Sequence, residues 1–191
     1  METAQQIGQT LKEKIVEAIP EINLIRDANL REKTLQVWED AITEGGWTIA
    51  ALHKMPFSIH VENCRISFIE HVRTVCKMCV AVHDVLKESY GSRSQLNKDY
   101  LISGALLADV GKLIEYEEKD GVITKAGRGQ HLRHPFTGVA MSHQRGIPPE
   151  VQHIIATHSK EGEMMERSNE SVIFHHADFI DFDLVSKKRP F

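Results

Sequence analysis

The sequence predicts an all-α fold with one small β-hairpin. Apolar residues recur at intervals of three and four along most of the 191 residues, as they do on one face of a helix. Glycine and proline residues separate these stretches, as expected of helix ends. Residues 116–127 differ, because two short extended runs there flank Asp120-Gly121, a dipeptide typical of tight hairpin turns.

Seven stretches have the helical spacing, and we expect a helix in each of them: 3–18, 27–43, 63–90, 98–115, 130–145, 148–159 and 168–185. The first three end at residues that stop helices, namely Pro20, Gly45-Gly46 and Gly91. The fourth leads into the hairpin, and Gly146-Ile147-Pro148 separates the fifth from the sixth. A short segment, 47–54, joins the second helix to the third, and a polar stretch precedes the seventh.

The composition is that of an ordinary globular protein, with 41% apolar and 26% charged residues. A formal net charge of −4 argues against a basic surface for nucleic acid or membranes. The longest uncharged apolar run, 100–108, is too short to cross a bilayer, and no secretion signal is recognisable at the start. With three cysteines, an odd number, a disulfide framework is not indicated. We therefore expect a cytoplasmic protein that binds neither nucleic acid nor membranes.

Histidine is frequent, with 11 residues, and its placement indicates a metal site. Five histidines and aspartates lie on apolar helix faces or at a helix start: His71, Asp109, His134, His158 and Asp178. Any one of them alone would be read as a hydrogen-bonded core residue. Burying two carboxylates together costs free energy unless a positive group compensates them. Because imidazole and carboxylate together suit divalent transition metals, a metal site is the simplest explanation.

The ordered motifs that carry these residues resemble the HD-domain superfamily of metal-dependent phosphohydrolases. The motifs are "PFSIHVENCRISFIEH", "GALLADVGKLIEY", "HPFTG", "THSKEGE" and "HHADFID", and their layout is most similar to the HD portion of bacterial 3′→5′ exoribonucleases. The resemblance implies an HD-domain helical bundle over residues 56–186. Residues 1–55 are then N-terminal helices packed on that core, and residues 187–191 are a frayed tail.

The resemblance also implies a dinuclear metal site. One metal ion is expected on His71, Asp109 and Asp178, and a second on His134 and His158, with Asp109 bridging the two. The family's remaining ligand, the histidine directly before the aspartate, falls on Ala108 in this chain. Iron or manganese is the expected metal, and cobalt, nickel or zinc would also suit these donors.

Further residues are candidates for contacts with substrate or for support of the ligands. We assign catalytic roles to Asp109 and to Lys112, which follows it within one helical turn. The other candidates flank the ligands in sequence: His60, Arg128, His131, Arg133, Lys160, His175 and His176.

The leading functional hypothesis is a hydrolase of a small, anionic and phosphorylated metabolite, impaired by Ala108. Paired metal ions activate water for attack on a phosphate ester. RNA is disfavoured as a substrate, because the exoribonuclease relatives carry a nucleic-acid-binding domain that this chain has no room for.

One alternative is a mixed-valent di-iron oxygenase of the same superfamily, which cleaves a C–C or C–P bond. Another is a degenerate, non-catalytic binding module. Whether Ala108 is natural or an introduced substitution stays open, and a homo-oligomer is possible.

Overall fold

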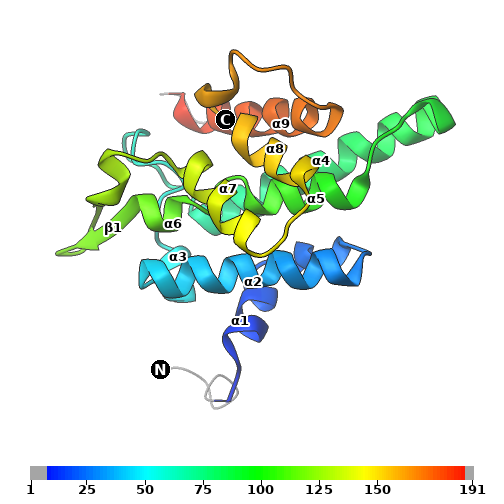
Figure 1. Ribbon diagram of the computed structural model, residues 1–191. Coiled ribbons are helices and arrows are strands. Elements are labelled where there is room, and N and C mark those ends of the chain that lie inside the picture. The colour runs from blue at the N-terminus through cyan, green and yellow to red at the C-terminus, as the bar shows by residue number, and fades with distance from the viewer. Residues whose placement is uncertain (1–7, 188–191) are drawn as a thin grey trace.

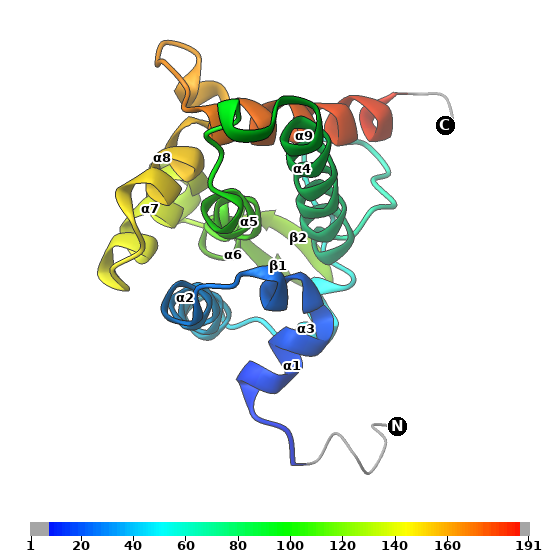
Figure 2. The same ribbon diagram turned by 90° about the vertical axis from the view of Figure 1, so that its right-hand side faces the viewer.

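Helix α5 (Lys98–Leu107) lies at the centre of the fold, and the other long helices surround it (Figures 1 and 2). The structure is a computed structural model that describes residues 8–187. Helix α5 contacts α2 (Ala28–Gly45), α4 (Phe68–Tyr90), α8 (Pro149–Thr157) and α9 (Asn169–Ser186). Because neighbours cover it on all sides, every residue from Leu101 to Leu107 is buried and the helix has no polar face.

The remaining elements are short and complete the shell around α5. They are α1 (Leu11–Ala18), α3 (Ile49–Leu52), α6 (Lys112–Glu115), α7 (His134–Gln144) and the 3₁₀ turns η1 (Pro20–Leu24), η2 (Gly91–Arg93), η3 (Arg128–Gln130) and η4 (Lys160–Gly162). The predicted hairpin is confirmed as strands β1 (Tyr116–Lys119) and β2 (Val122–Lys125), paired antiparallel. Asp120 and Gly121 both have positive φ, as this tight turn requires.

The N-terminal helices pack on one side of α5, below it in Figure 1. The fully buried Trp38 of α2 donates its indole N–H to the carbonyl oxygen of Leu106, at 3.1 Å. The hydroxyls of Thr34 and Ser103 share a buried hydrogen bond of 2.8 Å. These contacts hold α2 against the end of α5 that leads to Asp109.

The all-α class is confirmed, but four of the predicted helices differ from the structure by more than two residues at one end or are divided. The stretch 98–115 is two helices, because the chain breaks from α-helical geometry between Ala108 and Gly111. The stretch 63–90 begins only at Phe68, where Ser67 and Glu70 form a capping box. The helix expected at 130–145 begins at His134, and the described part of the stretch 3–18 is helical only from Leu11. Of the predicted tail, 188–191 lie outside the described residues, as do residues 1–7.

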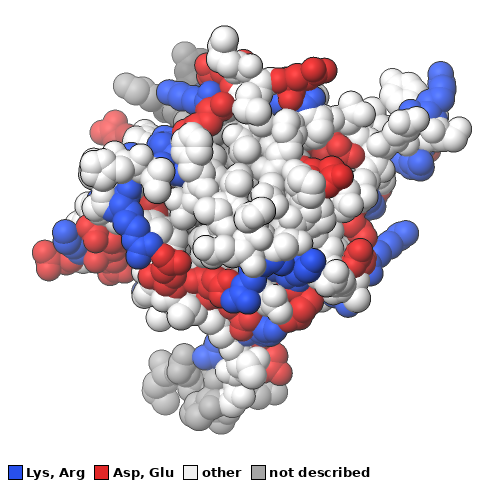
Figure 3. All heavy atoms as spheres, in the orientation of Figure 1, with Lys and Arg blue, Asp and Glu red and all other residues white. Residues whose placement is uncertain are grey.

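The face seen in Figure 3 shows acidic and basic side chains intermixed around an uncharged centre, rather than gathered by sign. Within residues 8–187, no helix combines the length and the apolar character needed to cross a membrane.

Candidate metal centre

Asp109 lies in the break between α5 and α6, and the break places its carboxylate between two groups of side chains. After Ala108 the backbone hydrogen bonds tighten to three-residue spacing, as in Val110 N–H to Leu107 O (3.1 Å) and Lys112 N–H to Asp109 O (2.8 Å). The Asp109 residue is only 5% exposed. Each of its two carboxylate oxygens faces a different set of partners.

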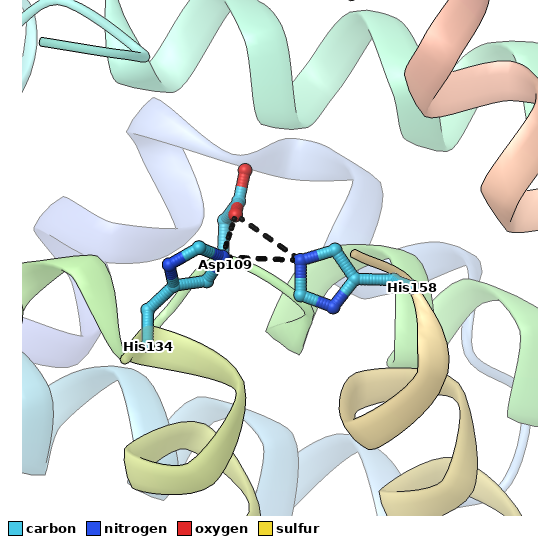
Figure 4. Close-up of side chains that lie close together, drawn as sticks. All are labelled: Asp109, His134 and His158. Carbon is cyan, nitrogen blue, oxygen red and sulfur yellow. Dashed lines mark hydrogen bonds and ion pairs between the residues drawn. The ribbon is translucent and has the colours of Figure 1, made fainter. Parts of the chain in front are cut away.

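The oxygen Oδ1 faces two imidazoles, and we call this set the histidine-pair position (Asp109, His134 and His158; Figure 4). Oδ1 lies 3.3 Å from Nε2 of His134 and 3.6 Å from Nε2 of His158. The two Nε2 atoms are 3.2 Å apart. His134 opens α7 and His158 directly follows α8, so the close packing of α7 on α8 brings the rings together.

The other ring nitrogens determine which tautomer each histidine adopts. His134 Nδ1 donates to Glu115 Oε2 at 2.7 Å, and His158 Nδ1 donates to the carbonyl oxygen of Ile155 at 2.7 Å. Both partners only accept hydrogen bonds, so in the neutral rings both Nε2 atoms carry a lone pair. Three lone-pair donors therefore converge at the histidine-pair position.

The oxygen Oδ2 faces the second set, the His71 position (His71, Asp109 and Asp178). His71 Nε2 is 3.2 Å from Asp109 Oδ2 and 3.1 Å from Asp178 Oδ1. The opposite ring nitrogen, Nδ1, donates to Asp181 Oδ2 at 2.7 Å. Lys112 is also bound here: its Nζ donates to Asp109 Oδ2 and to the carbonyl oxygen of Phe57, both at 2.8 Å.

The spacing of these atoms fits metal coordination. Imidazole nitrogens and carboxylate oxygens bind transition metals at about 2.0–2.2 Å, so neighbouring donors on one ion lie about 3.0–3.6 Å apart. The distances at both positions fall in this range. With both rings neutral, the three lone pairs at the histidine-pair position share no proton, and a cation would relieve their mutual repulsion. The residues present thus fit one ion at each position, with Asp109 common to both.

The two positions differ in the positive charge that the protein itself supplies. Burial disfavours the charged form of His71, but its hydrogen bonds to Asp109, Asp178 and Asp181 outweigh this and raise its pKa to about 10. Burial dominates at His134 and lowers its pKa to about 4. Lys112 adds a second cation on the Oδ2 side. The protein's own cations therefore compensate the His71 position, and the histidine-pair position lacks such compensation.

The profile of the HD domain family matches residues 68–183, more than half of the chain. The chain belongs to the HD domain family. A dihydroneopterin 2′,3′-cyclic phosphate phosphodiesterase of Methanocaldococcus jannaschii is 32% identical to this HD protein over 162 residues. The match covers 82% of this chain but only 64% of the relative, so it spans a little less than two thirds of the relative's length. No solved structure matches the chain at a significant level.

A cavity of about 360 Å³ opens above both candidate metal positions of this HD protein. Of the sequence-predicted residues, those that line it are His60, His71, Asp109, Lys112, Arg133, His134, His158, Lys160 and Asp178. Lys112 is buried rather than extended into solvent, because Asp109 and Phe57 hold its ammonium group.

Four other predicted residues lie outside this cavity. Arg128 is turned toward Glu44, with which it forms an ion pair, and His131 is exposed beside η3. His176 is exposed on α9, on a different side of the helix from Asp178. His175 lies outside the cavity but contacts the site, since its Nδ1 donates to the carbonyl oxygen of His158 at 2.9 Å.

Sequence reasoning missed the carboxylates that hold the candidate ligands His134 and His71, namely Glu115 and Asp181. Asp181 lies one helical turn after the candidate ligand Asp178, and Glu115 lies one turn after Lys112. That spacing could have revealed both of them. Such partners fix the orientation of a metal-bound imidazole, and their presence strengthens the case for a metal centre.

Proposed function

We propose that this HD protein is a metal-dependent phosphohydrolase acting on a small phosphorylated metabolite, and that Asp109 bridges two metal positions. The observation that carries the proposal is the placement of its carboxylate, with Oδ1 toward two imidazoles and Oδ2 toward His71 and Lys112. Divalent metal ions bound at such a site activate water and polarise phosphoryl oxygens. Iron and manganese suit the donors best, and cobalt, nickel or zinc would fit as well.

The substrate class we propose is a phosphodiester, most specifically a cyclic phosphate. The relative from Methanocaldococcus jannaschii is named for hydrolysis of a cyclic phosphate. That relationship favours hydrolysis over the oxygenase alternative of the same superfamily. Apart from residue 108, the five ligand candidates are all present and each histidine is held by an acceptor, which also argues against a degenerate binding module.

Three basic side chains of the cavity are suited to the phosphate charge. Arg133 and Lys160 line the cavity wall next to His134 and His158. Lys112 uses two of its three N–H donors on Asp109 and Phe57, which leaves one for a substrate oxygen. In this proposal Lys112 both orients the bridging carboxylate and contacts the substrate.

Ala108 weakens the His71 position in this proposal, because the family's fourth ligand is missing there. Three donors remain, and Lys112 already neutralises part of their charge. The histidine-pair position has a ligand set that does not depend on residue 108. We therefore expect the purified protein to hold about one metal ion per chain and to turn over slowly.

Elemental analysis of metal content tests the proposal. We would compare the protein with Ala108→His and Asp109→Asn, using the exposed Asp183→Asn of α9 as the matched control. The expected metal content is about one ion per chain for the protein and for the control, about two for Ala108→His, and near zero for Asp109→Asn. Circular dichroism of each variant shows whether it folds.

Activity is then measured on phosphomonoesters, phosphodiesters and 2′,3′-cyclic phosphates, in air and under argon. We expect Ala108→His to hydrolyse cyclic phosphates faster than the parent and equally well without oxygen. If the folded protein and Ala108→His both lack metal, the inward histidines are core residues and the proposal is wrong. Co-purified iron with strictly O₂-dependent turnover would instead support the oxygenase alternative.

A further inference from the structure

Aromatic side chains form one wall of the cavity, which we call the aromatic wall (Phe57, Phe179 and Phe182). Phe57 stacks on the ligand His71, with ring centroids 4.5 Å apart. Phe182 packs edge-on against Phe57 at 6.0 Å, and Phe179 lies 6.4 Å from Phe182. The row thus runs from the metal ligands outward to Phe179, which is 38% exposed.

Phe179 is held in place although it is exposed. Its ring lies 4.5 Å from the ring of His175, and His175 donates to the carbonyl oxygen of His158. A part-buried histidine, itself held by a hydrogen bond, therefore supports an apolar ring that lines the cavity. Rigid aromatic surfaces of this kind bind planar groups with little loss of conformational entropy.

The remaining walls of the cavity are polar and include Arg133 and Lys160. The Nε of Arg133 lies 3.3 Å from Oε1 of Glu161, and its Nη2 lies 3.5 Å from the hydroxyl oxygen of Ser159. At about 360 Å³ the cavity is at the small end of ligand sites, enough for one ring system and a short phosphorylated arm. A ligand that fits both the aromatic wall and the basic, polar walls is planar at one end and anionic at the other.

We propose that the aromatic wall binds the planar nitrogen heterocycle of the substrate, and that Phe179 determines the preference for a ring. This deepens the proposed function and rests on it, since it places the phosphate of the same substrate at the metal positions. Stacking of a heterocyclic base on one aromatic side chain typically changes affinity by roughly 5–150-fold.

Ring binding can be measured without turnover. Neopterin, which is fluorescent and lacks the phosphate, is titrated into metal-free protein and into Phe179→Ala and Phe179→Trp. Val172→Ala is the control, because Val172 is exposed on the same helix but lies outside the cavity. We expect quenching with similar affinity in the protein, the control and Phe179→Trp, and affinity at least about ten-fold weaker in Phe179→Ala.

Kinetics on two esters separates this proposal from the proposed function. In the metal-loaded Ala108→His background, Phe179→Ala should raise the KM for adenosine 2′,3′-cyclic phosphate about ten-fold. It should leave the KM for glycerol 1,2-cyclic phosphate, which carries no heterocyclic base, unchanged. Equal neopterin affinity in the folded protein and Phe179→Ala, or no binding to either, would overturn the aromatic wall even if hydrolysis occurs. Ring binding that depends on Phe179 without hydrolysis of any ester would overturn the proposed function alone.

Discussion

Replacing Glu115 by glutamine should weaken metal binding at the histidine-pair position without changing any ligand. Glu115 is 1% exposed, and its Oε2 accepts from both the backbone N–H and the ring Nδ1 of His134, each at 2.7 Å. Burial alone would raise the pKa of Glu115, but the hydrogen bonds from the ring and the backbone of His134 lower it to about 2, so the group is an anion. Glutamine keeps the shape and removes this charge.

The magnitude follows from the two hydrogen bonds and from the neighbours of the other oxygen. Hydrogen bonds to a charged group contribute about 1 kcal/mol more than neutral ones, so losing the charge should destabilise the fold by about 2 kcal/mol. In glutamine, the amide N–H₂ would take the place of Oε1, which lies 3.5 Å from Lys125 Nζ and 4.0 Å from Arg133 Nε. Support groups of this kind typically contribute 10–100-fold to metal affinity, about 1.4–2.7 kcal/mol.

Calorimetric titration with Mn²⁺ measures the metal affinity, and thermal unfolding of the metal-free protein measures the stability. The expected results are a Kd raised by about 10–100-fold and a Tm lowered by about 4–8 °C. Glu118→Gln is the matched control, because Glu118 is an exposed glutamate on strand β1, which directly follows Glu115. An unchanged Mn²⁺ affinity in folded Glu115→Gln would show that His134 does not bind the metal through a ring oriented by Glu115.

Two further predictions follow from packing and burial. Gly111→Ala should lower the stability by about 1–3 kcal/mol, because the added Cβ would lie 2.2 Å from the carbonyl oxygen of His134 and force α7 away from α6. Urea unfolding measures the change, and Gly127→Ala, whose Cβ meets no atom within 4 Å, is the control; equal midpoints would contradict the close approach. Among the cysteines, burial raises the pKa of the Cys76 thiol to about 12 and raises that of Cys79 as well. With a disulfide reagent near neutral pH we expect only the half-buried Cys64 to react before unfolding, and fast labelling that persists in Cys64→Ser would contradict this.

Much of the fold was predictable from the sequence, because helical periodicity and helix-stop residues survive tertiary packing. Asp109 shows the limit of that reasoning. Its apolar neighbours Leu106 and Leu113 predicted burial correctly, yet the same spacing predicted a continuous helix, and the structure has a break there. Turns with three-residue spacing preserve the apolar pattern while redirecting the chain, so periodicity alone cannot distinguish them from a helix.

For the candidate site, the sequence indicated which residues come together but not where every side chain points. The five ligand candidates are brought together in two groups that share Asp109. The sequence could not show in which direction the side chains near the ligand candidates point. Arg128 and His131 are close to the ligands along the chain but point elsewhere, because η3 turns them toward the surface. The spacing from Asp178 marks Asp181 as a candidate, but its contact with His71 depends on α4 and α9 lying side by side.

The two candidate metal positions share Asp109, but their full sets of donors become available at different stages of synthesis. The donors of the histidine-pair position all lie between Asp109 and His158, a contiguous segment that contains α7 and α8. The His71 position needs Asp178 of α9, the last helix within residues 8–187, and so has all its donors only after α9 is made. Because a growing chain folds from its N-terminal end, the histidine-pair position has all its donors before α9 is made. An ion at the His71 position would join α4 to α9. It would thus link two helices that are far apart in the sequence.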